Sequence, residues 1–315
     1  MNLKHLTGVL ILAILLALVI RTFIFETIRI ATPAMTDNQE IGNRLIVEKW
    51  SVGSRLPMTL GIPFVPDTLF GKRTYIRLAG NYTRLPGFGK IKRNDLLEFN
   101  CPAETDKPID KLPVLLSRCV GLPGEYVSLK GTELFINDKK IQRHPDVSTC
   151  YRYPIKLQKE VVRKLNLEQI NKATYQEKDS GFIYLTKYQY FTLIEKGRLG
   201  IDLKPCTFSY DERSAVIPFK GFCIKMDSYS YHVWGNLINR FEGIHLERTA
   251  DGHFKENGKG IDHYTFKQNY YWLLNDHQGY LNDSRSFGLI PESYIIGKAC
   301  LIFFSPKNKR FLQKI

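Results

Sequence analysis

The sequence predicts one membrane-spanning helix followed by a mainly β domain with an inserted α/β segment. A long apolar run fills the first 25 residues, and short runs rich in Val, Ile, Leu, Phe and Tyr recur after it between turn-forming residues. One stretch has helical rather than alternating spacing. Of the 315 residues, 43% are apolar and 24% are charged, which excludes a disordered chain, a collagen-like fibre and a polytopic membrane protein.

The apolar run occupies residues 6–25 and is interrupted only by Arg21. At about 1.5 Å per residue, a helix of this length spans the roughly 30 Å hydrocarbon core of a bilayer. A cleavable signal peptide is the alternative, but Phe23 and Glu26 stand where such a peptide has small residues. We therefore expect a short cytoplasmic segment at 1–5 and a single-pass anchor in the cytoplasmic (inner) membrane, with the rest of the chain on the periplasmic side.

The net charge of +14 fits binding to nucleic acid, contact with an anionic membrane surface, or a role in solubility alone. Because most of the chain is expected outside the cytoplasm, we take the lipid bilayer to be a partner and do not expect nucleic-acid binding.

The six cysteines show neither a CxxC spacing nor a zinc pattern, so no metal or cofactor is predicted. Cys119 and Cys300 lie in apolar runs, and buried thiols are the simplest interpretation. A disulfide remains the alternative among the other four, which are Cys101, Cys150, Cys206 and Cys223.

After the anchor, seven short apolar runs are predicted strands of an antiparallel sheet or barrel: 44–48, 95–99, 114–120, 126–129, 133–136, 182–185 and 297–304. The stretch 157–173 places apolar residues at near-helical intervals among charges, which predicts an amphipathic helix. We assign that helix to an insertion at 143–214, between a first core part at 26–142 and a second at 215–315.

Three stretches have residues whose choice serves no evident packing purpose: 30–49, 92–127 and 270–305. They contain Gly-Leu-Pro-Gly, Asp-Ser-Arg and Gly-Lys-Ala in that order, with turn and ion-pair residues at Gly121, Pro123, Gly124, Asp283 and Arg285. Each motif is weak alone. Together, and behind an anchor, they resemble the type I signal peptidases, which are membrane-tethered serine endopeptidases that remove signal peptides from exported proteins. The long insertion resembles the larger members from the Bacteroidetes group.

The resemblance implies a serine nucleophile in a Ser-Met pair just past the anchor and a lysine base in a Lys-Arg pair before Gly-Leu-Pro-Gly. A lysine acts as a base near neutral pH only when burial lowers its pKa. In this chain Ala34 precedes Met35, and Ser117 precedes Arg118. Both catalytic positions are therefore replaced.

The supporting positions are changed in part. Thr32 keeps a hydroxyl where the family has an oxyanion-stabilising one, but it has no evident base, and Leu281 stands where a serine holds the lysine. The family's Gly-Asp-Asn is Asn275, Asp276 and His277 here. We interpret this pattern as a retained scaffold without the catalytic dyad.

Three functions follow from this reading. The first is a pseudoenzyme that binds signal peptides or preproteins in a groove formed, by resemblance, by Ile30, Met35, Leu115, Leu116 and Arg118. The second is an active peptidase with a rebuilt Ser117–His277 pair. The third is a structural or regulatory partner of an active signal peptidase paralogue or of the export machinery, with the insertion as a docking face.

Overall fold

The computed structural model of the chain describes residues 3–31, 33–35, 41–61, 65, 67–78, 82–103, 107–131, 133–165, 176–177, 179–195, 203–206, 213–306 and 309–315. The description of the fold and of the site concerns these residues.

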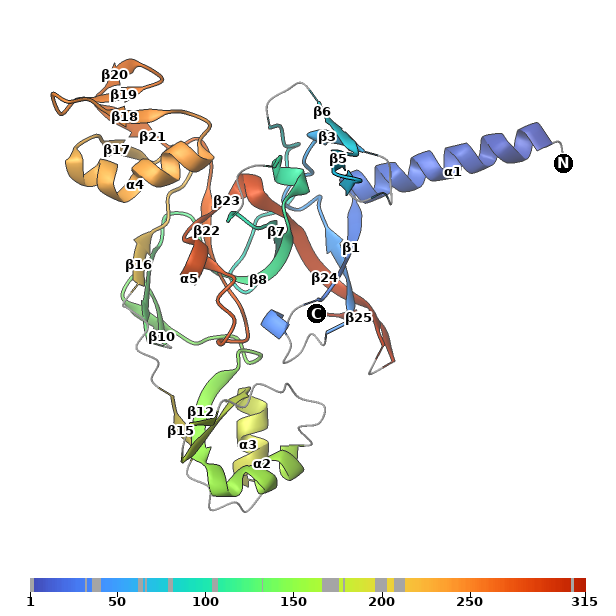
Figure 1. The fold of residues 1–315 in the computed structure, drawn as a ribbon, viewed down its shortest axis with the longest axis vertical. Helices are drawn as coiled ribbons and strands as arrows, with labels where there is room; N and C mark the ends of the chain where they lie inside the picture. The colour runs from blue at the N-terminus through green and yellow to red at the C-terminus, as the bar shows by residue number, and fades with distance from the viewer. Residues whose placement is uncertain are drawn as a thin grey trace.

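A long N-terminal helix, α1 (Leu3–Phe23), stands away from the body of the protein, and its residues are largely exposed (Figure 1). Its segment His5–Phe23 has a mean hydropathy of 2.5 and is long and apolar enough to cross a membrane. The predicted anchor ran to residue 25, but the helix ends two residues earlier. Phe25 begins strand β1, and its ring packs edge-on against Trp50 with 4.5 Å between ring centroids.

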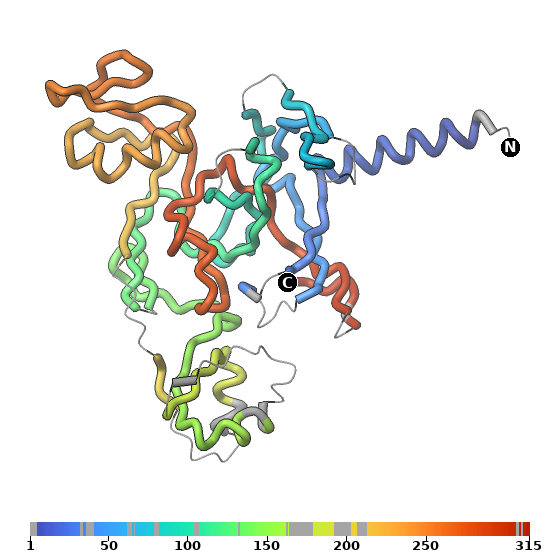
Figure 2. Tube along the Cα trace, viewed as in Figure 1, coloured from blue at the N-terminus to red at the C-terminus, as the bar shows by residue number. Residues whose placement is uncertain are grey.

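An antiparallel sheet forms the centre of the body. The described strands have the order β1-β2-β24-β7-β8-β22-β23, and β25 pairs with β24. Their bounds are β1 (Phe25–Arg29), β2 (Arg44–Glu48), β7 (Leu96–Asn100), β8 (Val114–Gly121), β22 (Tyr270–Leu274), β23 (Ile290–Pro291), β24 (Ile295–Ser305) and β25 (Arg310–Lys314). Segments far apart in the sequence meet in this sheet: strand β2 from the first 50 residues lies beside strand β24 near the C-terminus (Figure 2).

Apolar side chains lie on both faces of this sheet. One face buries a cluster that includes Leu45, Val47 and Leu116, and the other buries a cluster that includes Leu97 and Phe99. Successive side chains of a strand point to opposite faces, so a strand apolar on both faces is covered on both. The seven predicted strands are confirmed, as is the mainly β class.

A second antiparallel sheet continues from the first, in the order β11-β10-β9-β16. Its strands are β9 (Tyr126–Lys130), β10 (Glu133–Ile136), β11 (Lys139–Ile141) and β16 (Arg213–Val216). Beyond it lies a small lobe (Figure 1), formed by β17 (Cys223–Lys225), α4 (Ser228–Phe241), β18 (Leu246–Arg248), β19 (Phe254–Glu256), β20 (Lys259–Ile261) and β21 (His263–Thr265).

The segment predicted as an insertion has a core of its own, which includes Tyr153, Val161, Ile183 and Leu185. It contains β12 (Thr149–Pro154), α2 (Gln158–Leu165), β13 (Gln176–Glu177), β14 (Ser180–Leu185), α3 (Lys187–Glu195) and β15 (Lys204–Pro205). The helix predicted at 157–173 is present as α2, and the part from 166 onward lies outside the described residues. Helix α3 was not predicted, because its apolar residues lack a clear helical face.

The remaining elements are short. They are the strands β3 (Thr59–Gly61), β4 (Thr68–Leu69), β5 (Lys72–Arg73) and β6 (Tyr75–Arg77), the helix α5 (Ser284–Phe287), and the 3₁₀ turns Pro33–Met35, Ile109–Lys111, Ile155–Leu157 and Glu292–Tyr294.

Gly297 is required by the close approach of β2 and β24. A β-carbon there would lie 2.4 Å from the main-chain oxygen of Glu48 and 2.7 Å from a methyl carbon of Val47. We expect Gly297→Ala to cost about 1–3 kcal/mol through overpacking, which lowers the Tm of the full chain in detergent by several degrees. Gly260→Ala in β20 is the matched control, because a β-carbon there meets nothing within 4 Å. Equal melting temperatures for the two variants would contradict this account.

Candidate functional site

The fold brings the separate motifs of the sequence to one place. Ala34 lies in the 3₁₀ turn Pro33–Met35, and its main-chain oxygen accepts a hydrogen bond from the main-chain N–H of His277 (3.0 Å). Ala34 also packs in one buried cluster with Leu116 of β8. The position expected for the nucleophile therefore touches both the strand and the loop that hold the other site positions.

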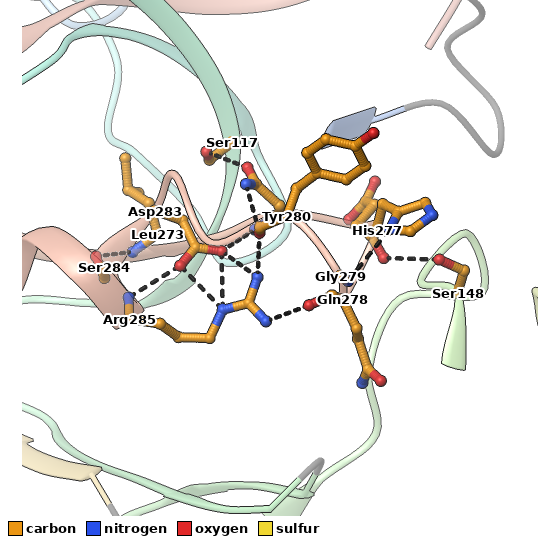
Figure 3. A network of polar contacts seen from close by, with 12 residues as sticks. Ser117, Ser148, Leu273, His277, Gln278, Gly279, Tyr280, Asp283, Ser284 and Arg285 are labelled. Carbon is orange, nitrogen blue, oxygen red and sulfur yellow. Dashed lines mark hydrogen bonds and ion pairs between the residues drawn. The ribbon is translucent and has the colours of Figure 1, made fainter. Parts of the chain in front are cut away.

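Ser117 is fully buried, and its hydroxyl is already used. Its Oγ donates a hydrogen bond to Oδ1 of Asn275 (2.7 Å). The side-chain amide of Asn275 donates to the main-chain oxygen of Tyr280 (3.0 Å), and its main-chain N–H donates to Asp283 (2.8 Å). Figure 3 shows Ser117 at one end of this network. Among the described residues, no lysine or histidine is hydrogen-bonded to this hydroxyl, so the described part of the site holds no base for Ser117.

Asp283 and Arg285 fix the shape of the loop 275–283. The guanidinium of Arg285 pairs with the buried carboxylate of Asp283 (2.6 Å). It also donates to the main-chain oxygens of Gln278 (2.7 Å) and Tyr280 (2.6 Å) (Figure 3). Asp283 in addition accepts the main-chain N–H of Arg285 at the start of α5.

Arg118 forms a second buried ion pair. Its Nε lies 2.7 Å from Oδ1 of Asp276 and its Nη2 lies 2.5 Å from Oδ2, while Asp146 lies 3.7 Å away. Burial lowers the pKa of Arg118, but the hydrogen bond and charge of Asp276, together with the charge of Asp146, raise it by more, so the net pKa is raised. Arg118 is only 5% exposed, so little of its side chain is open to a bound peptide, and its place in a peptide groove stays a prediction.

His277 is buried between two aromatic rings. Its ring centroid lies 4.4 Å from that of Tyr184 and 5.0 Å from that of Tyr280. Nδ1 accepts a hydrogen bond from the main-chain N–H of Gly279 (3.2 Å), and Nε2 has no hydrogen-bond partner. Burial lowers its pKa to about 4, so the ring is neutral at neutral pH. Neither nitrogen is bonded to Ser117, so the described site contains no Ser117–His277 dyad.

The other expected groove residues do not share one surface. Ile30, Met35 and Leu116 are buried together on one face of the sheet, whereas Leu115 packs against the cluster on the opposite face. Adjacent residues of a strand point to opposite faces, so Leu115 and Leu116 cannot line the same groove with their side chains.

The remaining predicted positions are scattered. Leu281 is 40% exposed at the tip of the loop, and Thr32 lies outside the described residues. In the Gly-Leu-Pro-Gly turn, Pro123 is half-buried and Gly124 has a φ of 86°. Gly121 is required because a β-carbon would lie 2.5 Å from Ile217. The described residues contain no cluster of His, Cys, Asp or Glu arranged to hold a metal ion.

Strand β8 has one edge that no described strand covers. β22 pairs with β8 only over 118–121, whereas β7 pairs with it over 114–118. Main-chain groups alternate between the two edges of a strand, and those of Cys119 bond to the β7 side. Val114 and Leu116 are an odd number of residues away from Cys119. Their N–H and C=O groups therefore point away from β7, to the uncovered edge beside the turn that holds Ala34.

Sequence reasoning missed two features of the site. The first is the hydrogen bond between Ser117 and Asn275. The sequence held a signal for it, because these two residues replace the family's lysine and glycine together. The second is the contact made by the insertion: Ser148 donates its main-chain N–H to the main-chain oxygen of Asp276 (2.9 Å), and the ring of Tyr184 packs at a tilt against that of His277. No motif marked either residue.

Comparisons with known proteins agree with this architecture. A family model described as "Signal peptidase, peptidase S26" matches residues 3–202 and 232–304. The "Signal peptidase I" of Buchnera aphidicola subsp. Schizaphis graminum is 25% identical over 291 residues, which cover 92% of this chain and 72% of that protein. The chain belongs to the signal peptidase family. It is a homologue of signal peptidase I with an apolar N-terminal helix that is suited to anchoring it in a membrane.

The buried His277 predicts a pH dependence of stability. Its folded-state pKa of about 4 lies below the ordinary value of 6.5, so the unfolded state binds more protons between these values and stability falls as the pH falls through this window. We expect the wild type to lose roughly 2–3 kcal/mol more than His277→Gln between pH 7 and pH 4.5. Urea unfolding in detergent measures this difference.

The matched control for this measurement is His232→Gln, which changes an exposed histidine on α4. Its pH dependence should follow that of the wild type. A wild-type curve parallel to that of His277→Gln would contradict the prediction.

Proposed function

We propose that this protein is a catalytically inactive signal peptidase homologue that binds signal peptides or other extended preprotein segments without cleaving them. It is anchored by α1 in the cytoplasmic membrane, and the mainly β body with its insertion at 143–214 lies on the periplasmic side. The observation that carries the proposal is the hydrogen bond between Ser117 and Asn275 at the position of the general base.

Inactivity follows from the chemistry that the site lacks. Ala34 offers no hydroxyl for attack on a peptide carbonyl. Ser117 offers no amine, and its hydroxyl is buried and donates to an amide oxygen, which is not a base at neutral pH. A serine-peptidase site without nucleophile and base keeps only the contribution of binding and oxyanion contacts, and its turnover falls by orders of magnitude.

The place of the missing lysine is also filled. By resemblance, the family has glycine where this chain has Asn275, and the Asn275 carboxamide lies in hydrogen-bond contact with the side chain at 117. A lysine built on the β-carbon of residue 117 would extend toward that carboxamide. The substitutions at 117 and 275 are thus complementary, because each residue satisfies the buried polar group of the other.

Peptide binding is supported by the uncovered edge of β8. An extended peptide that adds to a sheet edge gains main-chain hydrogen bonds that need no catalytic group. Val114 and Leu116 direct main-chain donors and acceptors to this edge, and Ala34 lies beside Leu116. A peptide bound there passes the place where the family cleaves, without meeting a nucleophile.

A restoration series tests the inactive site. We expect Ala34→Ser/Ser117→Lys/Leu281→Ser with Asn275→Gly to process a labelled preprotein in liposomes, because the glycine vacates the space for a desolvated lysine. The same triple variant with Asn275 retained should be slower by roughly a hundredfold, the order of the penalty for a misplaced catalytic group. Equal rates for the two variants would contradict the role given to Asn275, provided that both melt as the wild type does.

A proline substitution tests the peptide site. Val114 is 43% exposed, and its N–H faces the uncovered edge, so Val114→Pro removes one donor to a bound peptide without removing a bond to β7. We expect the Kd for a labelled signal peptide, measured by fluorescence anisotropy on the full chain in detergent, to rise about two- to tenfold.

Val114→Thr is the control for this substitution, since it keeps the N–H and the β-branched shape, and its Kd should match the wild type. The absence of saturable binding by the wild type at high micromolar protein would overturn the binding part of the proposal.

A further inference from the structure

Two cysteines of the insertion face each other across neighbouring strands. β12 and β15 are antiparallel, and their register pairs Tyr151 with Pro205. One step further along the same register places Cys150 opposite Cys206. The main-chain N–H of Cys206 donates to the oxygen of Cys150 (2.9 Å), and the two Sγ atoms lie 3.2 Å apart.

We propose that Cys150 and Cys206 are a disulfide site, oxidised to an intramolecular disulfide by thiol–disulfide exchange with a small-molecule disulfide such as oxidised glutathione. The distance between the sulfurs must shorten by about 1 Å to reach the bond length of about 2.05 Å. Cys150 lies in β12 and Cys206 directly follows β15, so this change is local to the side chains.

The other four cysteines do not compete for this pairing. Cys119 donates its thiol to the main-chain oxygen of Gly121 (3.6 Å), and Cys300 donates to that of Ile46 (3.4 Å). Cys101 follows β7 in the central sheet, and Cys223 lies in β17 of the distant lobe. Within the described part of the chain, the thiol of Cys150 therefore has the thiol of Cys206 as its neighbour.

Burial sets the order of the exchange. Cys206 is half-buried and Cys150 is fully buried, so the thiolate of Cys206 attacks the glutathione disulfide first. One glutathione leaves and a mixed disulfide forms. The Cys150 thiolate then attacks the Cys206 sulfur and releases the second glutathione. Two protein S–H bonds are replaced by one S–S bond, and the two electrons and two protons appear in two reduced glutathione molecules. Because burial raises the pKa of both thiols, this exchange quickens as the pH rises.

The disulfide would cross-link two strands of the insertion close to the site. It closes the chain between β12 and β15, a separation of 56 residues that includes α2, β14 and α3. Ser148, two residues before Cys150, bonds to the loop at Asp276. Tyr184 of β14 is the residue paired with Cys150 of β12, and its ring packs at a tilt against that of His277. A cross-link at Cys150 therefore lies two residues from one contact with the site loop and directly opposite the other.

Peptide mapping tests this site directly. The full chain in detergent is equilibrated with oxidised glutathione at pH 8, its remaining thiols are alkylated under denaturing conditions, and the digest is analysed by mass spectrometry. We expect a linked peptide pair that contains Cys150 and Cys206, and four of the six cysteines alkylated. Recovery of Cys150 and Cys206 in alkylated form, or linked to other cysteines, overturns the proposal.

Two variants sharpen the measurement. Cys206→Ser should leave all five of its cysteines alkylated, whereas Cys223→Ser, an exposed control, should keep the linked pair. The oxidised wild type should melt several degrees above its reduced form, and the Cys206→Ser protein should show no such difference. Equal melting of the oxidised and reduced wild type would argue that the bond, if formed, constrains nothing.

Discussion

The buried carboxylate of Asp283 is the interaction on which the site depends. A charge that is fully buried is tolerated only when paired and hydrogen-bonded, and Asp283 accepts from the guanidinium and main-chain N–H of Arg285 and from the main-chain N–H of Asn275. These bonds start α5, close the loop 275–283, and set the position from which Asn275 reaches Ser117. Removing one partner would leave an uncompensated charge and release the whole loop.

On the proposed inactivity, this arrangement accounts for a fold that persists without the family's chemistry. The ion pairs Asp283–Arg285 and Arg118–Asp276 hold β8 and the loop together, and neither needs a nucleophile or a base. The Ser117–Asn275 pair then satisfies two buried polar groups that a simple loss of the lysine would have left open. The residues that hold this loop and β8 in place are therefore different from those at the two positions of the family's dyad, Ala34 and Ser117.

Much of this was readable from the sequence. The anchor, the seven strands and the replaced dyad follow from hydropathy, alternation and short motifs, because these depend on residues near one another in the chain. The end of the anchor was misplaced because Phe23 and Phe25 are equally apolar, and only the strand pairing of β1 separates them. The partners of Ser117 and Arg118 lie 158 residues away, and the contact of Tyr184 with His277 joins two segments that carry no common pattern. Side-chain pairing at such separations depends on the tertiary fold. The same holds for the two faces of β8, where Leu115 and Leu116 look alike in sequence but lie in different clusters.

The most direct measurement is turnover by the unmodified full chain. The protein and an active signal peptidase are placed in matched liposomes with the same labelled preprotein, and the processed product is followed over many hours by gel electrophoresis. The account predicts product with the active enzyme and, with this protein, no more than in empty liposomes. Product formation by the unmodified chain, lost on Ser117→Ala, would contradict the central claim and show that the buried serine is a nucleophile.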